Sequence, residues 1–207
     1  MAVAQRSVNP LEQSLRSAAS DLAQLGRSFA VVGGLAVSTW AEPRLTRDAD
    51  LAVAVVDDTD AELLVATLRG RGYRVLAAVE QVATGRLGTV RLVGESGGAD
   101  GIVTDLLFAS SGIEAEIVEQ AISTMVVPGL VLPVACVGHL IAMKLLARDD
   151  RRRPADADDL AALSVVATEH DWGVAATAVN LIADRGFGRG RDLLMAFREL
   201  HGNRPNT

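Results

Sequence analysis

The 207-residue sequence contains a single cysteine, Cys136, and very few aromatic side chains. One cysteine excludes an intrachain disulfide and a cysteine-rich metal site. Aromatic residues make up 3% of the chain, which leaves few platforms on which nucleic-acid bases could stack. Lysine is nearly absent as well, because 19 of the 20 basic residues are arginine and only Lys144 is lysine. Arginine and lysine differ chemically, so this solitary lysine requires an explanation.

The sequence also lacks a convincing membrane-spanning run. Residues 125–143 carry no Asp, Glu, Lys or Arg, but they include Pro128, Gly129 and Pro133, which a spanning helix tolerates poorly. A Pro-Gly hairpin followed by a buried helix explains this stretch better. The first 21 residues have no basic start followed by an apolar core, as a secretory signal would. We therefore expect a cytoplasmic protein without a membrane partner.

Composition is that of an ordinary folded protein. Hydrophobic residues make up 49% and charged residues 22%, which argues against long disorder. The length suggests one compact domain, or one domain with a helical appendage. The net charge of −6 argues against a surface coated in positive charge, although it allows a local basic groove.

Hydrophobic periodicity divides the chain into an α/β part, residues 1–133, and a helical part, residues 134–207. The α/β part is expected to hold helices at 9–26, 35–41, 57–69 and 113–122, strands at 29–32, 50–56, 88–93 and 102–108, and then the Pro-Gly hairpin. The helical part is expected to hold helices at 137–148, 156–168, 172–185 and 190–200.

Two short motifs in the α/β part point to phosphate and metal chemistry. Asp48 and Asp50 are two residues apart, so in a strand both carboxylates project from the same face. Such a pair repels unless a cation lies between the two groups, and oxygen ligands favour Mg²⁺ or Mn²⁺. Gly33-Gly34 follows a buried strand and opens a short helix, where glycine lets the backbone approach a phosphate. Each motif alone is also compatible with a solvated strand entry or a plain turn.

Asp105 lies in the apolar strand expected at 102–108. A carboxylate there is costly to bury unless it is hydrogen-bonded, paired or bound to a metal. On a neighbouring strand it could complete a three-carboxylate site with Asp48 and Asp50. The alternative is an acid on a strand face that points to water.

Lys144 lies in a segment that is apolar almost all the way round, so its charge needs an acidic partner or an anionic ligand. Asp156, Asp158 and Asp159 begin the following helix, and Asp159 is the best placed to turn inward. A Lys144–Asp159 pair is then either a structural bridge or a site lysine held by an acid. We favour the second interpretation, because the point charge of lysine suits a phosphate.

Several other residues carry weaker signals. The three histidines have no metal-ligand spacing, and Cys136 lies in an apolar context typical of a core. Arginines cluster at two expected helix ends, where they could contact RNA phosphates or complement the helix dipole. The second role is the more common. The clusters are Arg69, Arg71 and Arg74, and Arg185, Arg189 and Arg191.

Together these residues resemble the nucleotidyltransferase superfamily that includes DNA polymerase β, and more closely the AbiEii/AbiGii toxins of type IV toxin–antitoxin systems. The resemblance covers about residues 29–163. It rests on Val32-Gly33-Gly34, Arg44-Leu45-Thr46-Arg47-Asp48-Ala49-Asp50, Asp105, Lys144, the basic loop 148–153 and the acidic helix start 156–160. Pro154-Ala155 stand where the family has a basic residue before the last acid, and we prefer Asp159 to Asp156 as the functional acid.

The resemblance implies an α+β fold: a polymerase β-like core of mixed sheet and flanking helices, followed by a C-terminal helical bundle, residues 134–207, that completes the active-site cleft. It implies a nucleoside triphosphate (NTP) donor at Gly33 and Gly34, and Mg²⁺ or Mn²⁺ on Asp48 and Asp50, with Asp105 as a possible third ligand. The catalytic set would be Asp48, Asp50, Lys144 and Asp159, with Arg44 or Arg47 steadying the triphosphate beside Lys144.

In this family the expected acceptor is RNA, in particular the 3′ end of tRNA, so that translation is blocked. The resemblance further implies a cognate antitoxin, and it marks Thr46 as a candidate for phosphorylation by that partner. Two other functions remain open: transfer to a small molecule, as in antibiotic nucleotidylyltransferases, and a degenerate fold kept as a binding module. Retention of Asp48, Asp50, Asp105 and Lys144 together speaks against the binding module.

Overall fold

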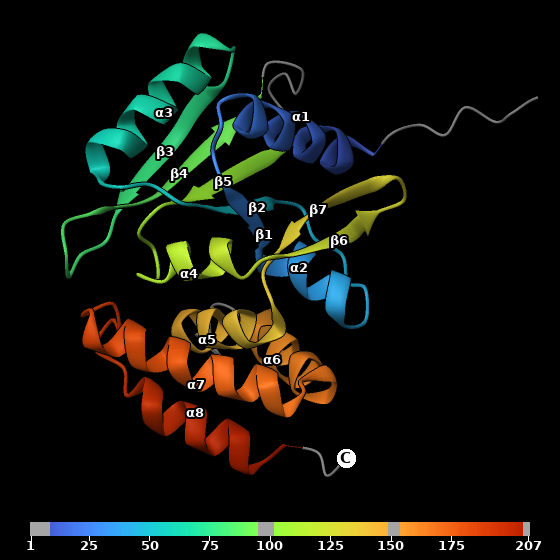
Figure 1. The fold of residues 1–207 in the computed structure, drawn as a ribbon, viewed down its shortest axis with the longest axis vertical. Helices are drawn as coiled ribbons and strands as arrows, with labels where there is room; N and C mark the ends of the chain where they lie inside the picture. Colours follow the sequence, from blue (N-terminus) through green and yellow to red (C-terminus); the bar gives the residue numbers. More distant parts are fainter. Residues whose placement is uncertain (1–8, 95–101, 149–153, 205–207) are drawn as a thin grey trace, which may run out of the picture.

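A mixed sheet of seven strands forms the middle layer of the computed structural model, which describes residues 9–94, 102–148 and 154–204 (Figure 1). The strand order is β3-β4-β5-β2-β1-β7-β6. The strands are β1 (Phe29–Val32), β2 (Ala49–Val53), β3 (Arg74–Glu80), β4 (Leu87–Val93), β5 (Val103–Leu107), β6 (Ile122–Val127) and β7 (Leu130–Val134). The pairs β2–β5 and β1–β7 are parallel, and the other neighbouring pairs are antiparallel.

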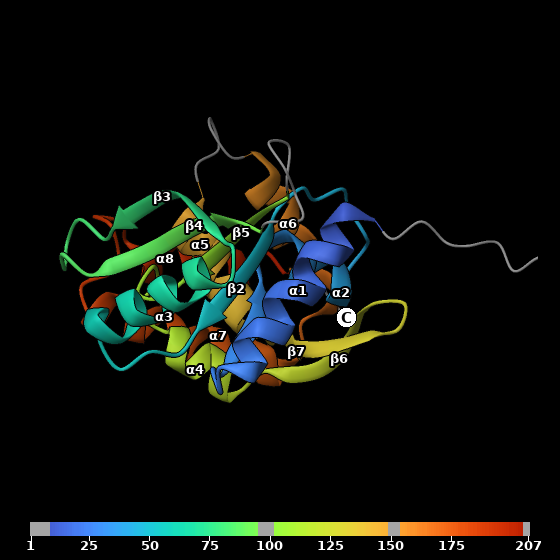
Figure 2. The ribbon, with the colours of Figure 1, turned by 90° about the horizontal axis from the view of Figure 1, so that it is seen from above.

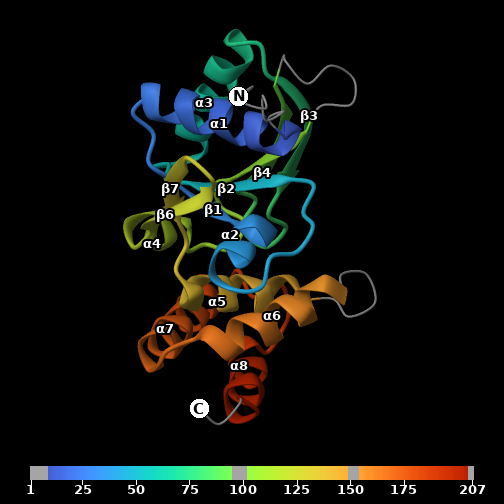
Figure 3. The ribbon, with the colours of Figure 1, turned by 90° about the vertical axis from the view of Figure 1, so that its right-hand side faces the viewer.

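Helices cover both faces of the sheet. In Figures 1 and 3, α1 and α3 lie on one side, while α2, α4 and the four C-terminal helices lie on the other. Seen from above in Figure 2, α1 and α3 run across the sheet side by side. The helices are α1 (Pro10–Gln24), α2 (Gly33–Trp40), α3 (Asp58–Gly70), α4 (Glu114–Glu119), α5 (Val137–Ala147), α6 (Pro154–Val166), α7 (Glu169–Asp184) and α8 (Leu193–Gly202). The expected α+β fold is confirmed.

The N-terminal helix shows how local sequence produces this packing. Asn9 caps α1, because its side-chain oxygen accepts a hydrogen bond from the backbone N–H of Leu11. Leu15, Ala18 and Leu22 recur at helical spacing and are buried against the sheet. Full burial of a leucine side chain stabilises the fold by about 1.5–3 kcal/mol.

The C-terminal helices are joined to the rest of the fold through α5, which is buried on nearly every side. Helix α5 crosses α7 so closely that a Cβ atom on Gly138 would lie 2.4 Å from the carbonyl oxygen of Asp171. Glycine at this position therefore permits the crossing. This crossing holds the helix that carries Lys144 in a fixed place beneath the sheet.

The main difference from the sequence-based prediction is β3, which was not expected. All seven residues of β3 are exposed, and the strand forms the edge of the sheet. Because neither face of β3 is buried, its sequence shows no alternation of apolar and polar residues, which is the signal that predicts a strand. At the expected boundary between the two parts, β7 ends at Val134. Within the described residues, no helix is both long and apolar enough to cross a bilayer.

Candidate active site

A cavity of about 340 Å³ lies between the sheet and helix α5. Strands β1, β2, β5 and β4 contribute to one wall, and α5 contributes the other. The cavity brings together acidic and basic side chains that are far apart in the sequence. Its charged lining residues are Asp48, Asp50, Arg91, Asp105, Lys144 and Arg189, with Gly33, Thr89, Ser110 and Ser111 beside them.

The glycine turn and Asp50 fit closely together at one end of this cavity. Gly33 follows β1 directly and adopts a φ of 66°, in the left-handed region that favours glycine. A Cβ atom at this position would lie 1.9 Å from Oδ2 of Asp50. Asp50 is held there by strand pairing, because it lies opposite Val32 on β1. A residue with a side chain at position 33 would therefore displace the Asp50 carboxylate.

Gly34 behaves differently from its neighbour. It is buried and does not line the cavity, and an added Cβ would meet Nη2 of Arg44 at 2.6 Å. The glycine pair thus serves two purposes. Gly33 opens the cavity to a ligand, and Gly34 makes room for an arginine behind it.

Asp105 is beside Asp50 as expected but is bound to an arginine. The two aspartates are direct neighbours in the parallel pairing of β2 and β5. Both Asp105 oxygens accept hydrogen bonds from Arg91 on β4, from Nε at 2.9 Å and from Nη2 at 2.7 Å. These hydrogen bonds raise the pKa of the Arg91 guanidinium above its ordinary value. Asp105 is therefore a buried acid that is paired, one of the arrangements that the sequence left open.

Two of the three cavity acids can hold a divalent cation together with substrate phosphates, but the three acids do not form a metal site by themselves. Among the described residues, no three or more acidic, histidine or cysteine side chains are placed to hold a metal ion together. Mg²⁺ in nucleotide sites is usually bound by one or two carboxylates together with substrate phosphates. Asp48 and Asp50, which both line the cavity, fit this smaller arrangement. Recruitment of Asp105 as a third ligand stays a prediction and requires its separation from Arg91.

Lys144 enters the cavity from α5 as part of a buried ionic network. Its Nζ donates to Oδ1 of Asp156 at 2.8 Å and lies 2.7 Å from Oδ2 of Asp159. The three residues are 5%, 2% and 1% exposed, respectively. Both acids lie in the first two turns of α6, three residues apart and therefore on one face of the helix. The expected contact between Lys144 and Asp159 is present, and Asp156 shares the lysine with it.

Arg44 completes the network from the other side. It donates to Asp159 through Nε at 2.6 Å and Nη2 at 2.8 Å. Burial alone would raise the pKa of Asp159, but the hydrogen bonds from Arg44 and Lys144 outweigh it and hold the pKa below its ordinary value. Two cations thus face two carboxylates, as a buried network requires. Arg44 binds an acid at the back of Lys144, so a direct contact with a triphosphate is not the role that this geometry gives it.

The remaining predicted residues lie near the cavity without lining it. Arg47 is exposed, in the segment between α2 and β2. Thr46 is half-buried, and its hydroxyl donates to the carbonyl oxygen of Asp48 at 3.5 Å. Of the basic loop expected at 148–153, residues 149–153 lie outside the described residues, and so do residues 95–101, between the strands expected at 88–93 and 102–108.

The sequence analysis did not assign Arg91, Ser110 or Ser111 to the site, and it named Arg189 only within an arginine cluster at a helix end. A detectable signal existed for Arg91, since it lies in an expected strand that precedes the strand of Asp105. Their direct pairing depends on the antiparallel register of β4 and β5. Ser110 and Arg189 meet only through the tertiary fold, with Nη2 of Arg189 donating to the Ser110 carbonyl at 3.0 Å.

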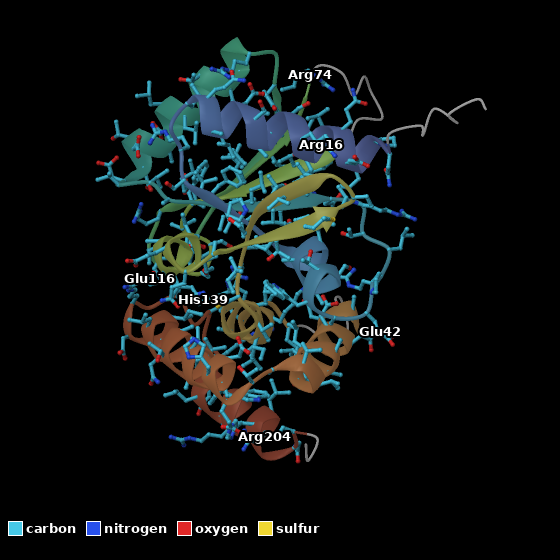
Figure 4. The ribbon with its side chains drawn as sticks, turned by 45° about the vertical axis from the view of Figure 1, so that its right-hand side comes forward. Arg16, Glu42, Arg74, Glu116, His139 and Arg204 are labelled. Carbon is cyan, nitrogen blue, oxygen red and sulfur yellow. The ribbon has the colours of Figure 1, made fainter. Side chains whose placement is uncertain are left out.

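A second set of titratable side chains lies away from the cavity, where α4 faces α5 (Figure 4). His139 is buried, and its Nδ1 lies 3.3 Å from Sγ of Cys136. Burial lowers the pKa of His139, and nearby Glu116 partly opposes this effect. Cys136 is buried as expected, so this pair belongs to the core.

Comparison with solved structures finds similar folds at low sequence identity. A nucleotidyltransferase-like protein from Paracoccidioides brasiliensis, described as antigenic, matches with a TM-score of 0.55 and 15% identity, covering 93% of this chain and 94% of that one. The structure of ANT(2″)-Ia in complex with adenylyl-2″-tobramycin has a TM-score of 0.45 and 16% identity, covering 91% of this chain and 98% of that one. The first of these supports the nucleotidyltransferase fold.

Comparison with curated proteins finds no match. Comparison with family models gives a match that spans most of the chain, residues 17–203. The matching model is described as the nucleotidyl transferase AbiEii toxin of type IV toxin–antitoxin systems. The matched range contains the cavity, its acids and Lys144. The chain therefore belongs to the AbiEii nucleotidyl transferase toxin family, and it is a nucleotidyltransferase.

Proposed function

We propose that this enzyme transfers a nucleoside monophosphate from an NTP to the 3′ end of an RNA, with tRNA as the acceptor, and thereby blocks translation. The observation that carries the proposal is the position of Asp48 and Asp50 beside Gly33 in a cavity closed by Lys144. Membership of a toxin family supports an acceptor on which the cell depends, and it implies an NTP substrate and an antitoxin partner.

The residues of the cavity divide the work of the transfer. Without a side chain, Gly33 lets the donor phosphates approach the backbone at the start of α2. Lys144, fixed by Asp156 and Asp159, presents a cation to the triphosphate from the opposite wall. A divalent cation on Asp48 and Asp50 would supply charge neutralisation for the phosphates and an acidified acceptor hydroxyl.

The chemical step is an in-line exchange of one bond for another. The acceptor 3′-hydroxyl oxygen bonds to the α-phosphorus, its proton passes to solvent, and the α–β phosphoanhydride bond breaks to release pyrophosphate. The protein contributes mainly positioning and charge stabilisation, as in other phosphoryl transfers. We assign the catalytic roles to Asp48, Asp50 and Lys144, with Asp159 and Arg44 as positioning residues.

Thr46 is the residue through which we propose that the antitoxin acts. Its hydroxyl contacts the backbone of Asp48, so a phosphate on that oxygen would place two negative charges beside the metal-binding pair. Thr46→Val, which cannot be phosphorylated, should then remain toxic in the presence of the antitoxin. Full neutralisation of this variant would exclude phosphorylation of Thr46.

The test of the main proposal is a labelling experiment. The purified protein is incubated with each α-labelled NTP, Mg²⁺ and total RNA, beside Asp48→Ala and a control, Asp158→Ala, which removes an exposed acid from α6. We expect one or more NTPs to label RNA of tRNA size, the control to match the wild type, and Asp48→Ala to abolish labelling. Absence of label in RNA, or equal labelling by Asp48→Ala, would refute the proposal.

A second candidate is transfer to a small hydroxyl-bearing molecule. A cavity of about 340 Å³ falls within the range of small-molecule sites, which favours this alternative. Adding tobramycin, the adenylylated ligand of ANT(2″)-Ia, to the same incubation tests one such acceptor. Label in the small molecule and none in RNA would favour this second function.

A further inference from the structure

Arg189 lies at the junction of the active-site cavity and a second cavity. The second cavity has a volume of about 570 Å³ and lies between the β3–β4 turn and the loop that joins α7 to α8. Of the residues lining these two cavities, Arg189 is the one they share. The path out of the active site on this side therefore passes an exposed arginine. Besides Arg189, the second cavity is lined by Val79, Glu80, Gln81, Val82, Ala83, Gly186 and Gly190.

The backbone at Arg189 has a conformation in which arginine is rarely found. Its φ of 54° is positive, and no other non-glycine residue in the described ranges has a positive φ. Gly190 follows with a φ of 72°, and the N–H of Arg191 donates to the carbonyl of Gly188 at 3.0 Å. A turn with two central residues at positive φ favours glycine or asparagine at both places. Glycine at position 189 would satisfy the turn, so arginine is present for its side chain.

The loop that carries Arg189 is fixed against the end of β5. Gly186 and Phe187 close helix α7 with backbone bonds to Ala183 and Ile182, the pattern of a Schellman motif. The ring of Phe187 packs over Gly112, where an added Cβ would lie 2.5 Å from it. The Arg189 guanidinium is held by Ser110, whose carbonyl and hydroxyl oxygens accept from Nη2 at 3.0 and 3.3 Å. The cation thus stands in a fixed position at the rim of the cavity.

The strand order places Arg189 at the end of the active-site cavity opposite Gly33, where the NTP donor is proposed to bind. Gly33 follows β1, Asp48 and Asp50 lie just before and on β2, and Thr89 lies on β4, with β5 between β2 and β4. Neighbouring strands are about 4.8 Å apart, so the cavity extends roughly 14 Å from β1 to β4. A triphosphate at the Gly33 end therefore leaves the β4 side, near Arg189, for the second substrate. The two substrates can then meet at Asp48 and Asp50.

We propose that Arg189 binds the last phosphodiester of a single-stranded RNA acceptor, and that the preceding nucleotide lies in the second cavity. The arginine supplies a positive charge where an acceptor strand leaves the active site. Val79 and Val82 give the groove apolar walls that can contact a base without selecting its identity, and Val82 is fully exposed at the turn. This inference rests on the proposed RNA acceptor and deepens it, because it names the part of the acceptor that the enzyme holds.

The first test measures binding without catalysis. A fluorescein-labelled single-stranded oligoribonucleotide with a free 3′ end is titrated with wild type, Arg189→Gly and Arg191→Ala, in the absence of NTP. Arg189→Gly removes the side chain and relieves the positive φ, so its melting temperature should equal or exceed that of the wild type. Arg191→Ala removes an exposed charge from the same loop and serves as the matched control.

We expect Arg189→Gly to weaken RNA binding at least about tenfold, the effect of losing a charge-assisted hydrogen bond. The slope of log K against log salt should also fall by about 0.7, the value for one phosphate on a single strand. Arg191→Ala should bind RNA as the wild type does. Equal binding by Arg189→Gly and the wild type, or no binding by the wild type, would overturn the inference.

A second pair of variants tests the groove. Val82→Glu places a negative charge where the preceding nucleotide is expected, whereas Val165→Glu places the same charge on an exposed position of α6. We expect weaker RNA binding for the first alone, and equal effects of the two would overturn the groove. Binding requires no transfer, so an enzyme that binds RNA through Arg189 but labels no RNA would refute the proposed function and leave the site in place.

Discussion

The fit between Gly33 and Asp50 leads to a prediction whose size follows from the structure. In Gly33→Ala, the added Cβ would begin 1.9 Å from Oδ2 of Asp50, so the carboxylate must retreat by about 1.5 Å to reach the 3.4 Å at which ordinary contact begins. A misplacement of 1 Å in an active site can cost about 100-fold in rate. The positive φ adds a backbone cost of about 1–2 kcal/mol for any L-residue. We therefore expect nucleotide transfer to fall by about 100-fold or more.

Gly26→Ala is the matched control for this experiment. Gly26 has the same φ of 66°, but an added Cβ there would meet nothing within 4 Å. Both variants carry the same backbone cost and should lower the melting temperature, and the displacement of Asp50 should lower it further in Gly33→Ala. Transfer of labelled nucleotide to RNA should fall only in Gly33→Ala. Equal activity in the two variants would refute the idea that the bare backbone at position 33 sets the position of Asp50.

Three further predictions follow from charged and titratable side chains that the fold pairs or buries. Lys144→Met leaves two buried acids facing one arginine and should lower the free energy of unfolding by about 3–5 kcal/mol in urea titrations, whereas adding Asp156→Asn should recover much of that loss without restoring activity. Arg91→Gln releases Asp105 and should tighten Mg²⁺ binding measured by calorimetry, and unchanged affinity would show that Asp105 is not a ligand. Burial lowers the pKa of His139, so as pH falls below about 6.5 this imidazole is protonated in the unfolded chain before it is protonated in the folded protein. The free energy of unfolding therefore declines with falling pH until the pH reaches the pKa of His139 in the folded protein. His139→Gln should flatten this dependence between pH 5 and 7.5, and an unchanged slope in urea titrations would contradict it.

The sequence was most informative where hydrophobic pattern and chemistry agreed. The first helix, the strand before Gly33 and the Pro-Gly hairpin all have clear periodicity or turn residues, and each appears in the fold within a few residues of its expected bounds. Strand β3 was missed because none of its residues is buried, so no pattern marks it. Edge strands are stabilised by backbone pairing with one neighbour, and pairing of this kind leaves little trace in side-chain polarity.

For the candidate site, spacing identified single residues better than it identified partners. Asp48, Asp50 and Lys144 could be selected because each departs from its surroundings in a way that chemistry explains. Lys144 could also be paired with Asp159, but the arginine partners of Asp105 and Asp159 could not be selected, because Arg91 and Arg44 reach them only through strand register and the docking of α6. Arginine is abundant in this sequence, so residue type alone could not distinguish these two from the others.

The position of Lys144 in the sequence determines when the active-site cavity can form during synthesis on the ribosome. The glycine turn and all three cavity acids precede β6 in the sequence, whereas Lys144, its two acidic partners and Arg189 all follow β7. A nascent chain that has emerged only through β7 has the sheet and its acids but lacks the wall that faces them. The catalytic chamber therefore cannot form until the ribosome has also made the helices that follow β7, up to the loop of Arg189.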